Sequence, residues 1–283
     1  MRGTRPERAL LQHVDEQKIA ADRGAIVVAC SGGPDSVALA SLLARLAPKH
    51  EWRLVLAHVN HHVRESSWQD ECIVAAVGAR LGLPVRVAAL SPTGKPRPSE
   101  ADLRELRYAA LAEIAQAEGA DTVVTAHTAE DQTETVLLAL FRGTGLRGLA
   151  GMPSRRRLSG HIQLVRPLLR LSRRDLHAEL ASALPYARDP SNVDPAYRRN
   201  SVRAALGPLR DEFPRLDEAV ARCAEIVAGE LRADPRGDAR RRVREALSQH
   251  AGLADVPFER IEAALRARHG RIFIKDGVDV LKS

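Results

Sequence analysis

Cysteine is scarce in this chain of 283 residues, which contains only Cys30, Cys72 and Cys223. Because the three cysteines are far apart and odd in number, the sequence predicts neither a disulfide framework nor a metal site made of paired thiols. A reducing compartment is the default for such a chain, and we therefore expect a cytoplasmic protein.

Long apolar runs are also missing. The strongest runs, Ile26–Cys30 and Val136–Phe141, are about six residues long, whereas a membrane-spanning helix needs roughly 20. Residues 1–24 mix arginines with acidic residues and lack an uninterrupted apolar stretch. This pattern favours an amphipathic helix over a signal peptide. We therefore expect a soluble protein that does not contact a membrane.

Lysine is nearly absent, with five lysines against 38 arginines, and the net charge of +7 is unevenly distributed. Between Leu140 and Arg210, fourteen arginines and four acidic residues give +10, so the remainder of the chain carries −3. A basic stretch on a mildly acidic body is typical of a protein that binds a phosphate-rich partner such as nucleic acid. A GC-rich genome would explain the preference for arginine over lysine, but not the clustering of arginine away from acids.

Short apolar runs alternate with segments of helical periodicity between Ala25 and Val165. This alternation predicts an α/β fold with a doubly wound, mainly parallel sheet, in which ligands bind beyond the carboxyl ends of the strands. The predicted strands are Ile26–Cys30, Leu54–Val59, Val85–Ala89, Thr122–Ala126 and Ile162–Val165. The predicted helices between them are Ser36–Leu46, Gln69–Leu81, Glu100–Ala117 and Glu130–Phe141.

The character of the sequence changes after Pro190. We divide the chain into a larger α/β domain of residues 1–205, which carries the motifs described below, and a small, mostly helical domain of residues 206–283. Ser91–Ser99, which contains three prolines and a glycine, is predicted to be a mobile surface loop. The predicted elements of the small domain are the helices Pro208–Ala233, Arg236–Ala251 and Pro257–His269 and the hairpin strands Arg271–Lys275 and Val278–Leu281.

The first predicted strand runs directly into a glycine-rich loop and then into a helix. The glycines let the backbone turn tightly, and the helix N-terminus adds about half a positive charge, so a phosphate group fits there. A carboxylate beside a phosphate repels it unless a cation lies between them, which indicates Mg²⁺ at Asp35. A turn whose Asp35 and Ser36 only cap the helix is the alternative interpretation. The residues of the loop are Ser31, Gly32, Gly33, Pro34, Asp35 and Ser36.

This loop resembles the PP-loop of the ATP pyrophosphatase family, whose pattern is Ser-Gly-Gly-x-Asp-Ser. The resemblance implies that ATP is cleaved between its α and β phosphates and that the loop holds the pyrophosphate. No Gly-x-x-x-x-Gly-Lys-Ser/Thr segment is present, which disfavours an enzyme that cleaves the γ phosphate. Gly143–Gly148 has the spacing of a dinucleotide-binding turn, but it follows a predicted helix rather than a strand, so that interpretation fails.

Further segments, taken in order over roughly residues 24–210, resemble tRNA(Ile)-lysidine synthetases. They are His58–Arg64 with Glu71, Glu100–Tyr108, His127–Leu149, Asp189–Asn192 and Arg199–Asn200. The sequence departs from the family pattern at Thr128, where relatives often have a second histidine, and at Glu130, where the negative charge is kept. Longer relatives have additional C-terminal domains, so we expect the small domain and the basic stretch to recognise RNA beyond the anticodon arm.

The resemblance implies that the wobble cytidine of tRNA(Ile) with a CAU anticodon reacts with ATP and free L-lysine to give lysidine, AMP and pyrophosphate. The C2 oxygen of cytosine is a poor leaving group, and its attack on the α phosphate would convert it to AMP, which the lysine amine displaces. Because that amine has a pKa near 10.4, it needs a general base or a desolvating pocket. We assign Asp35 to Mg²⁺ and to amine activation. We assign Asp131 and Glu134 to holding the amine, and Arg104 to phosphate charge or substrate placement.

The basic stretch supplies the predicted contacts with tRNA phosphates. A single-stranded anticodon loop makes it inexpensive to unstack the target base. The sequence leaves open whether the chain forms a homodimer. The predicted tRNA contacts are Arg155, Arg156, Arg157, Arg198 and Arg199.

Several of these residues also have simpler interpretations. His58 and His127 follow predicted strands, so we expect hydrogen bonds to ATP or to core backbone rather than a zinc site. Asp131 and Glu134 could form the solvated start of a helix, and Arg104 could be plain surface charge. Among functions, a PP-loop tRNA thiolase stays an alternative, although such enzymes usually need paired cysteines. A PP-loop RNA-binding protein without catalysis is the other.

Overall fold

The computed structural model describes residues 19–21, 23–60, 67–90, 100–179, 184–187, 198–233, 270–275 and 278–282, together with Arg8 and Gln12. The predicted N-terminal amphipathic helix, the loop 91–99 and the helices 236–251 and 257–269 lie outside these residues. The chain divides into two compact units, one of residues 1–135 with 152–221 and one of residues 136–151 with 222–283. The boundary between residues 205 and 206 that we derived from the sequence stays a prediction.

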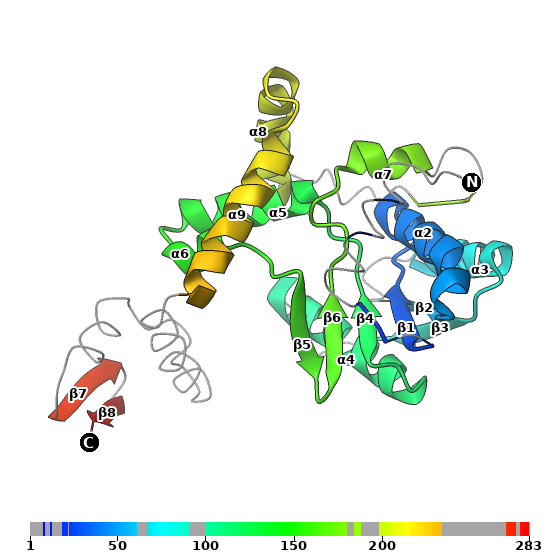
Figure 1. The fold of residues 1–283 in the computed structure, drawn as a ribbon, viewed down its shortest axis with the longest axis horizontal. Helices are drawn as coiled ribbons and strands as arrows, with labels where there is room; N and C mark the ends of the chain where they lie inside the picture. Colours follow the sequence, from blue (N-terminus) through cyan, green and yellow to red (C-terminus); the bar gives the residue numbers. More distant parts are fainter. Residues whose placement is uncertain are drawn as a thin grey trace. The chain divides into compact units, whose positions relative to one another are not determined.

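Six strands form one sheet in the order β3-β2-β1-β4-β6-β5 (Figure 1). Neighbouring strands are parallel except for β5, which is antiparallel to β6. The chain proceeds from β1 outward to β3 and then returns to the other side of β1 at β4, which confirms the predicted doubly wound α/β fold. The strands are β1 (Ala25–Ala29), β2 (Arg53–Asn60), β3 (Val85–Ala89), β4 (Thr122–Val124), β5 (Arg155–Ser159) and β6 (Ile162–Val165).

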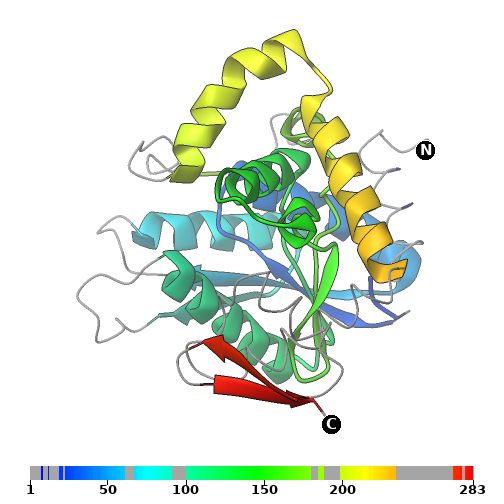
Figure 2. The same cartoon turned by 90° about the vertical axis from the view of Figure 1, so that its left-hand side faces the viewer.

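Alternate residues of the strands face two layers of helices. Ile26 and Val28 belong to a hydrophobic cluster with residues of α2, α3 and α7, whereas Val27 between them packs in a second cluster with residues of α4. Because β1 is buried on both faces, its sequence is continuously apolar instead of alternating. The helices of these layers, which Figure 2 shows from another side, are α2 (Pro34–His50), α3 (Ser67–Leu81), α4 (Glu100–Ala117) and α7 (Arg173–Glu179).

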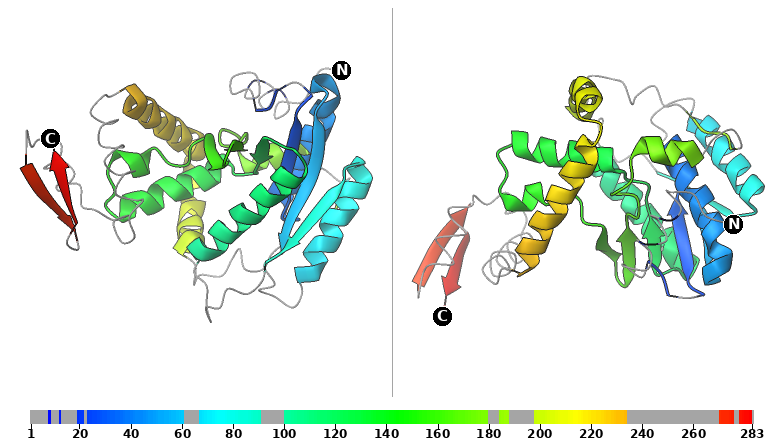
Figure 3. Two further views of the ribbon diagram at one scale, coloured as in Figure 1. Left: turned by 90° about the horizontal axis from the view of Figure 1, so that it is seen from below. Right: turned by 45° about the horizontal axis from the view of Figure 1, so that its top comes forward.

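The remaining elements correct one prediction and confirm another. The helix predicted at Pro208–Ala233 is two helices, because the chain turns at Phe213–Arg215, where Pro214 lacks an N–H. Its predicted start was also wrong, since Pro208 lies inside the first of the two, which begins at Arg198. The predicted C-terminal hairpin is present, with antiparallel β7 and β8 drawn in red in Figure 3. None of the described helices combines the length and apolar character needed to cross a membrane. The remaining elements are α5 (Ala129–Phe141), α6 (Leu146–Leu149), α8 (Arg198–Glu212), α9 (Leu216–Ala233), β7 (Gly270–Lys275) and β8 (Val278–Lys282).

Gly78 of α3 lies close to the start of β3, and a Cβ atom added there would lie 2.4 Å from Val85 Cγ2 and 3.0 Å from the Leu83 carbonyl oxygen. We expect Gly78→Ala to lower the free energy of unfolding by about 1–3 kcal/mol, because it overpacks this contact. Gly207 of α8 supplies the control, since an added Cβ would meet nothing within 4 Å. Gly207→Ala should raise the free energy of unfolding by about 0.5–1 kcal/mol. Urea titrations compare the two, and equal effects would contradict the packing argument.

Candidate active site

The carboxyl ends of β1 and β4 lie side by side where the order of the strands reverses. β1 leads into the loop Ser31–Ser36 and α2, while β4 leads into Thr125–Thr128 and α5. Ligands of doubly wound sheets bind at such a switch point. The fold therefore brings together two of the segments that the sequence singled out.

The hydroxyl of Ser36 forms hydrogen bonds with the backbone of the loop after β1. Ser36 Oγ donates to the Gly33 carbonyl oxygen at 2.9 Å and accepts a hydrogen bond from the Ser31 backbone N–H at 3.2 Å. Gly32 has a φ of 85°, a left-handed conformation that glycine adopts without strain. Pro34 begins α2, where its missing N–H is not needed. A tight turn at the start of a long helix suits an anion, although the hydroxyl of Ser36 already serves the loop itself.

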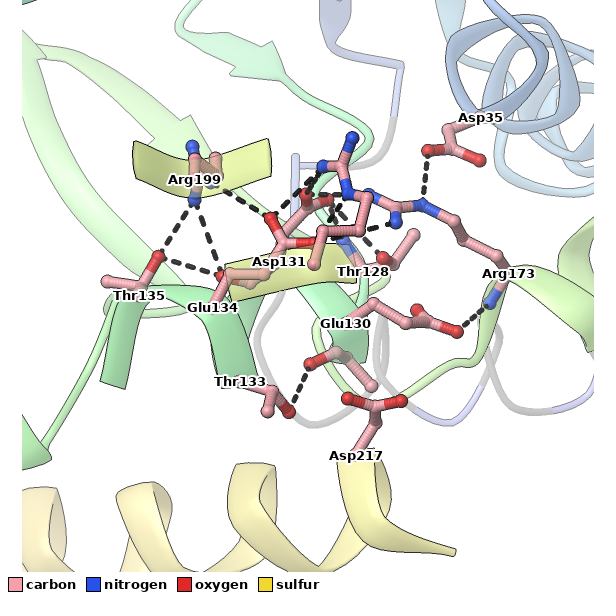
Figure 4. Close-up of polar contacts among 12 residues, drawn as sticks. Asp35, Thr128, Glu130, Asp131, Thr133, Glu134, Thr135, Arg173, Arg199 and Asp217 are labelled. Atoms are coloured by element: carbon pink, nitrogen blue, oxygen red, sulfur yellow. Dashed lines mark hydrogen bonds and ion pairs between the residues drawn. The ribbon is translucent and has the colours of Figure 1, made fainter. Parts of the chain in front are cut away.

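Asp35, in the first turn of α2, contacts two basic side chains of α7. Its Oδ2 accepts a hydrogen bond from Arg173 Nε at 3.0 Å, and its Oδ1 lies 2.6 Å from His177 Nε2. Figure 4 shows Arg173 extending between Asp35 and the residues of α5. The acid of the loop is therefore joined, by one ion pair and one hydrogen bond, to a helix that begins only after β6.

Asp131 of α5 binds the same arginine. Its Oδ1 accepts from Arg173 Nη2 at 2.7 Å, and its Oδ2 accepts from the backbone N–H of Thr128 at 3.0 Å. Burial would raise the pKa of the Asp131 carboxyl, but the charge of Arg173 and the Thr128 N–H outweigh it and hold the pKa below its ordinary value. Glu130, its neighbour, accepts from the Arg173 backbone N–H at 2.8 Å. Two hydrogen bonds from Arg173 thus connect the start of α7 to the first turn of α5.

Glu134, one turn further along α5, has a fully buried side chain. It forms a bidentate pair with Arg203 of α8, at 2.7 and 3.0 Å, and its Oε2 lies 3.0 Å from Arg199 Nε. Arg199 also donates to Thr135 Oγ1 at 2.9 Å, and Arg173 Nη1 lies 3.9 Å from Glu134. A buried carboxylate requires partners of this kind, because an unpaired charge would cost several kcal/mol.

The three carboxylates and their partners form a balanced network. Asp35, Asp131 and Glu134 are matched by three arginines with His177 beside them, and each of the six carboxylate oxygens has a donor or an ion-pair partner. A cation that enters this network must therefore compete with an arginine already there. The arginines of the network are Arg173, Arg199 and Arg203.

The same arrangement bears on magnesium. Among the residues that the structure describes, no group of three or more His, Cys, Asp or Glu side chains could hold a metal ion. Both oxygens of Asp35 contact basic groups, so the side chains as they lie do not fit Mg²⁺, and we derive no step through it. Magnesium at Asp35 stays a prediction, one in which phosphates and water would have to supply most ligands.

The two histidines predicted to contact ATP lie in different surroundings. His58 is buried, and its Nδ1 lies 2.9 Å from the Cys30 carbonyl oxygen. Since a carbonyl only accepts, Nδ1 carries the hydrogen, and His58 ties β2 to the start of the loop. His127 is half-buried, and its Nδ1 lies 2.9 Å from Thr125 Oγ1. Burial lowers the pKa of His127 to about 3. The negative charge of Asp131 opposes this effect, whereas nearby arginines, Arg166 first, add to it.

The remaining predicted site residues do not all share one surface. Arg104 lies exposed on α4, and Arg198 is exposed at the start of α8. Arg199, predicted to contact tRNA, is instead engaged by Glu134 and Thr135. Arg155 and Arg157 pair across β5–β6 with Val165 and Gln163, whereas Arg156 pairs with Leu164, so successive arginines of β5 face opposite sides of the sheet.

Sequence reasoning missed three members of the network, namely Arg173, His177 and Arg203. Arg173 and His177 lie on α7, a helix of seven residues, too short for helical periodicity to reveal. A signal was present, because Arg173 follows Ile162–Val165, the last predicted strand of the parallel sheet, and site residues of such folds are expected after strands. The segment Asp189–Asn192 and the residues His61 and His62, which contributed to the resemblance, lie outside the described residues.

Comparisons with known proteins show the family of this chain. Residues 4–210 match the family model described as a PP-loop domain. The chain is 46% identical over 211 residues to a tRNA(Ile)-lysidine synthase of Salinispora tropica, with 73% of this chain and 63% of that protein covered. It is 37% identical over 254 residues to a tRNA(Ile)-lysidine synthase of Thermosynechococcus vestitus, with 88% of this chain and 72% of that protein covered.

Similarity to a solved structure concerns the fold alone. The U34-tRNA thiolase NcsA from Methanococcus maripaludis superposes with a TM-score of 0.65 at 16% sequence identity, covering 78% of this chain and 76% of that chain. Some relatives are longer than the matched region, since the chain spans 63% of the tRNA(Ile)-lysidine synthase of Salinispora tropica and 65% of that of Salinispora arenicola. The similarity therefore covers only part of the length of these relatives.

His127 makes stability depend on pH. Its folded pKa of about 3 lies below the ordinary 6.5, so between these values the unfolded chain binds a proton that the folded chain does not. The contribution of His127 to stability is therefore complete above pH 6.5 and is lost as the pH falls toward 3. Between pH 7 and 5, the wild type should lose about 1–2 kcal/mol more of its free energy of unfolding than His127→Gln does.

Urea denaturation at several pH values measures this difference. His161→Gln, which removes an exposed imidazole, controls for the loss of any one histidine. Parallel pH curves for wild type and His127→Gln would show that the ring is not held neutral by its surroundings.

Proposed function

The chain belongs to the PP-loop domain family and to the family of tRNA(Ile)-lysidine synthases, and we propose that it joins lysine to the wobble cytidine of tRNA(Ile) at the expense of ATP. The products would be lysidine, AMP and pyrophosphate. The observation that carries this proposal is the union of Asp35 and Asp131 on one arginine at the switch point of the sheet. An anion-binding turn and a carboxylate pair lie within one site, as the reaction of a phosphate compound with an amine requires.

ATP would bind with its phosphates at the loop Ser31–Ser36, on the N-terminus of α2. Attack of the cytosine C2 oxygen on the α phosphate forms the new P–O bond and releases pyrophosphate. The lysine ε-amine then forms the C–N bond at C2, and AMP leaves with the former C2 oxygen. The proton lost by the amine passes to a base or to solvent.

The three carboxylates would have different roles, because their side chains differ in exposure to solvent. The side chains of Asp35 and Asp131 are 24% and 13% exposed, so a lysine ammonium group can approach them, whereas Glu134 is fully enclosed. We therefore propose that Asp35 and Asp131 receive the amine and that Glu134 positions Arg199 and Arg203. The amine would displace Arg173, whose freed guanidinium could then stabilise charge on the phosphates.

A tRNA thiolase is a weaker candidate. The likeness to a U34-tRNA thiolase is one of fold, at 16% identity. Cys30, Cys72 and Cys223 are free and do not pair, and Cys30 is buried. Nothing in the described site offers the two neighbouring thiols on which the thiolase alternative depends.

The direct test is incubation of the chain with tRNA(Ile) transcript, ATP and labelled lysine in a magnesium-containing buffer, followed by nucleoside analysis. We expect label in lysidine, with one AMP released for each lysine incorporated. Omission of ATP, and a transcript whose anticodon lacks the wobble cytidine, are the controls. ATP cleavage that depends on tRNA but incorporates no lysine would point to another PP-loop modification and contradict the proposal.

Substitutions at two acids of α5 should separate their roles. Asp131→Asn should raise the apparent KM for lysine more than that for ATP, because the amine loses a counter-charge. Glu134→Gln should instead lower the free energy of unfolding by about 3–5 kcal/mol, because it leaves two arginines without their buried partner. Glu218→Gln, in an ion pair with Arg215 that is largely exposed, is the matched control and should change neither quantity measurably.

Steady-state kinetics and urea denaturation provide the two readouts. Equal increases of both KM values in Asp131→Asn would assign that residue to the integrity of the site instead of to lysine. A stable Glu134→Gln variant with impaired lysine binding would reverse the proposed division between the two acids.

A further inference from the structure

Arg166 is a buried arginine outside the carboxylate network. It follows β6, and it is 4% exposed. Its Nη1 donates to the Pro153 carbonyl oxygen at 2.8 Å and its Nη2 to the Tyr108 hydroxyl at 3.3 Å. Its Nε is also buried and has no hydrogen-bond partner in the described part of the chain. Two of its nitrogens therefore donate hydrogen bonds within the protein, whereas the third has no acceptor among the described residues.

Two more arginines gather around the same tyrosine. The guanidinium carbon of Arg156 lies over the Tyr108 ring, 4.7 Å from its centroid. Arg156 pairs with Leu164, which packs in the cluster under α4, and Arg166 comes two residues after Leu164 on the same face. Arg104 lies one turn before Tyr108 on α4, exposed, and its charge acts on both Tyr108 and Arg166.

This cluster differs from the network around Glu134 in having no acid. Across the described ranges, no Asp or Glu forms an ion pair with Arg104, Arg156 or Arg166. Burial lowers the pKa of Arg166, and the charges of Arg156 and Arg104 lower it further, although Tyr108 opposes them. Burial would raise the pKa of Tyr108, but the arginines lower it. The positive charges of Arg156 and Arg104 thus add to the effect of burial on Arg166 and oppose it on Tyr108, and an anion bound nearby would offset them.

The cluster lies at the functional edge of the sheet. Arg166 follows the carboxyl end of β6, which is parallel to β4, and the charges of Arg166 and Asp131 both act on His127. We propose that Arg104, Arg156 and Arg166 bind a phosphate group of the substrates, on the α4 face of the sheet beside the carboxylate network. Guanidinium groups suit phosphate because their N–H groups match its oxygens in pairs. Only the identity of the molecule that carries the phosphate rests on the proposed function.

A nucleotide and an RNA backbone offer the same chemistry, so two probes distinguish the sources. The first probe is ATP and the second is an RNA hairpin with the anticodon loop of tRNA(Ile), each titrated against the full chain over a salt series. Arg156→Gln and Arg166→Gln should weaken one of the probes by about tenfold or more. If RNA is the carrier, the salt slope should fall by about 0.7 for each single-strand phosphate that the variant no longer binds. If ATP is the carrier, the RNA slope stays unchanged and the ATP Kd rises.

Arg86→Gln is the matched control, because Arg86 is an exposed arginine on β3 that pairs with Glu118. This variant should bind both probes as tightly as the wild type does. An equal loss of affinity in Arg86→Gln would show that only the net charge matters, and it would contradict the proposed site. Circular dichroism checks folding. If Arg166→Gln does not fold, the binding of the two probes by Arg156→Gln and Tyr108→Phe tests the proposal instead. Tyr108→Phe keeps the ring under Arg156 and removes the hydroxyl that accepts from Arg166.

Wild-type binding of both probes by the folded variants would also overturn the proposal. The lysine-incorporation assay separates the two proposals. Arginine-dependent binding without lysidine formation leaves the phosphate site standing and refutes the proposed function. Lysidine formation by the wild type, together with unchanged binding of both probes by the arginine variants, supports the proposed function and refutes the phosphate site.

Discussion

The buried carboxylate of Glu134 is the constraint on which the arrangement of the helices around the site depends. An ionised group without access to water must be paired, or it costs several kcal/mol. Arg199 and Arg203, one turn apart on α8, meet this need and fix α8 against α5. Through Arg173 the same set of charges reaches α7, and through Asp35 it reaches α2. Charge pairs therefore link four helices from distant parts of the sequence at one edge of the sheet.

Much of the fold could be predicted from the sequence because its strands are buried on both faces. β1 reads as a continuous apolar run because Ile26 and Val28 face one helical layer and Val27 the other. β5 could not be predicted in this way, since Arg155–Arg157 has no apolar pattern and is a strand only by pairing with β6. The single helix predicted from Pro208 failed at Pro214, where a missing N–H outweighs the apolar periodicity on either side.

Only part of the site could be predicted from the sequence. Its acidic residues could be predicted, whereas most of their basic partners could not. Its acids, Asp35, Asp131 and Glu134, lie in recognisable segments after strands. Their partners are harder to recognise as partners, because Arg173 is 138 residues from Asp35 in the sequence and sits among thirteen other arginines of the basic stretch. Nothing local distinguishes an arginine that will pair with a distant acid from one that stays in solvent. Since Arg173, Arg199 and Arg203 pair with acids outside the basic stretch, less of its charge is available to a partner than +10 indicates.

His127 connects the two halves of the site. The charge of Asp131 in the balanced network raises its pKa, whereas the charge of Arg166 in the arginine cluster lowers it, as do the charges of Arg199 and Arg107. These opposing effects leave burial as the largest influence on its pKa, and the ring stays neutral at physiological pH. A neutral ring adds no charge to either neighbour. If the two proposals hold, a neutral ring here weakens neither the attraction of the carboxylates for an amine nor that of the arginines for a phosphate. A charged residue at this position would instead favour one of the two proposed ligands and disfavour the other.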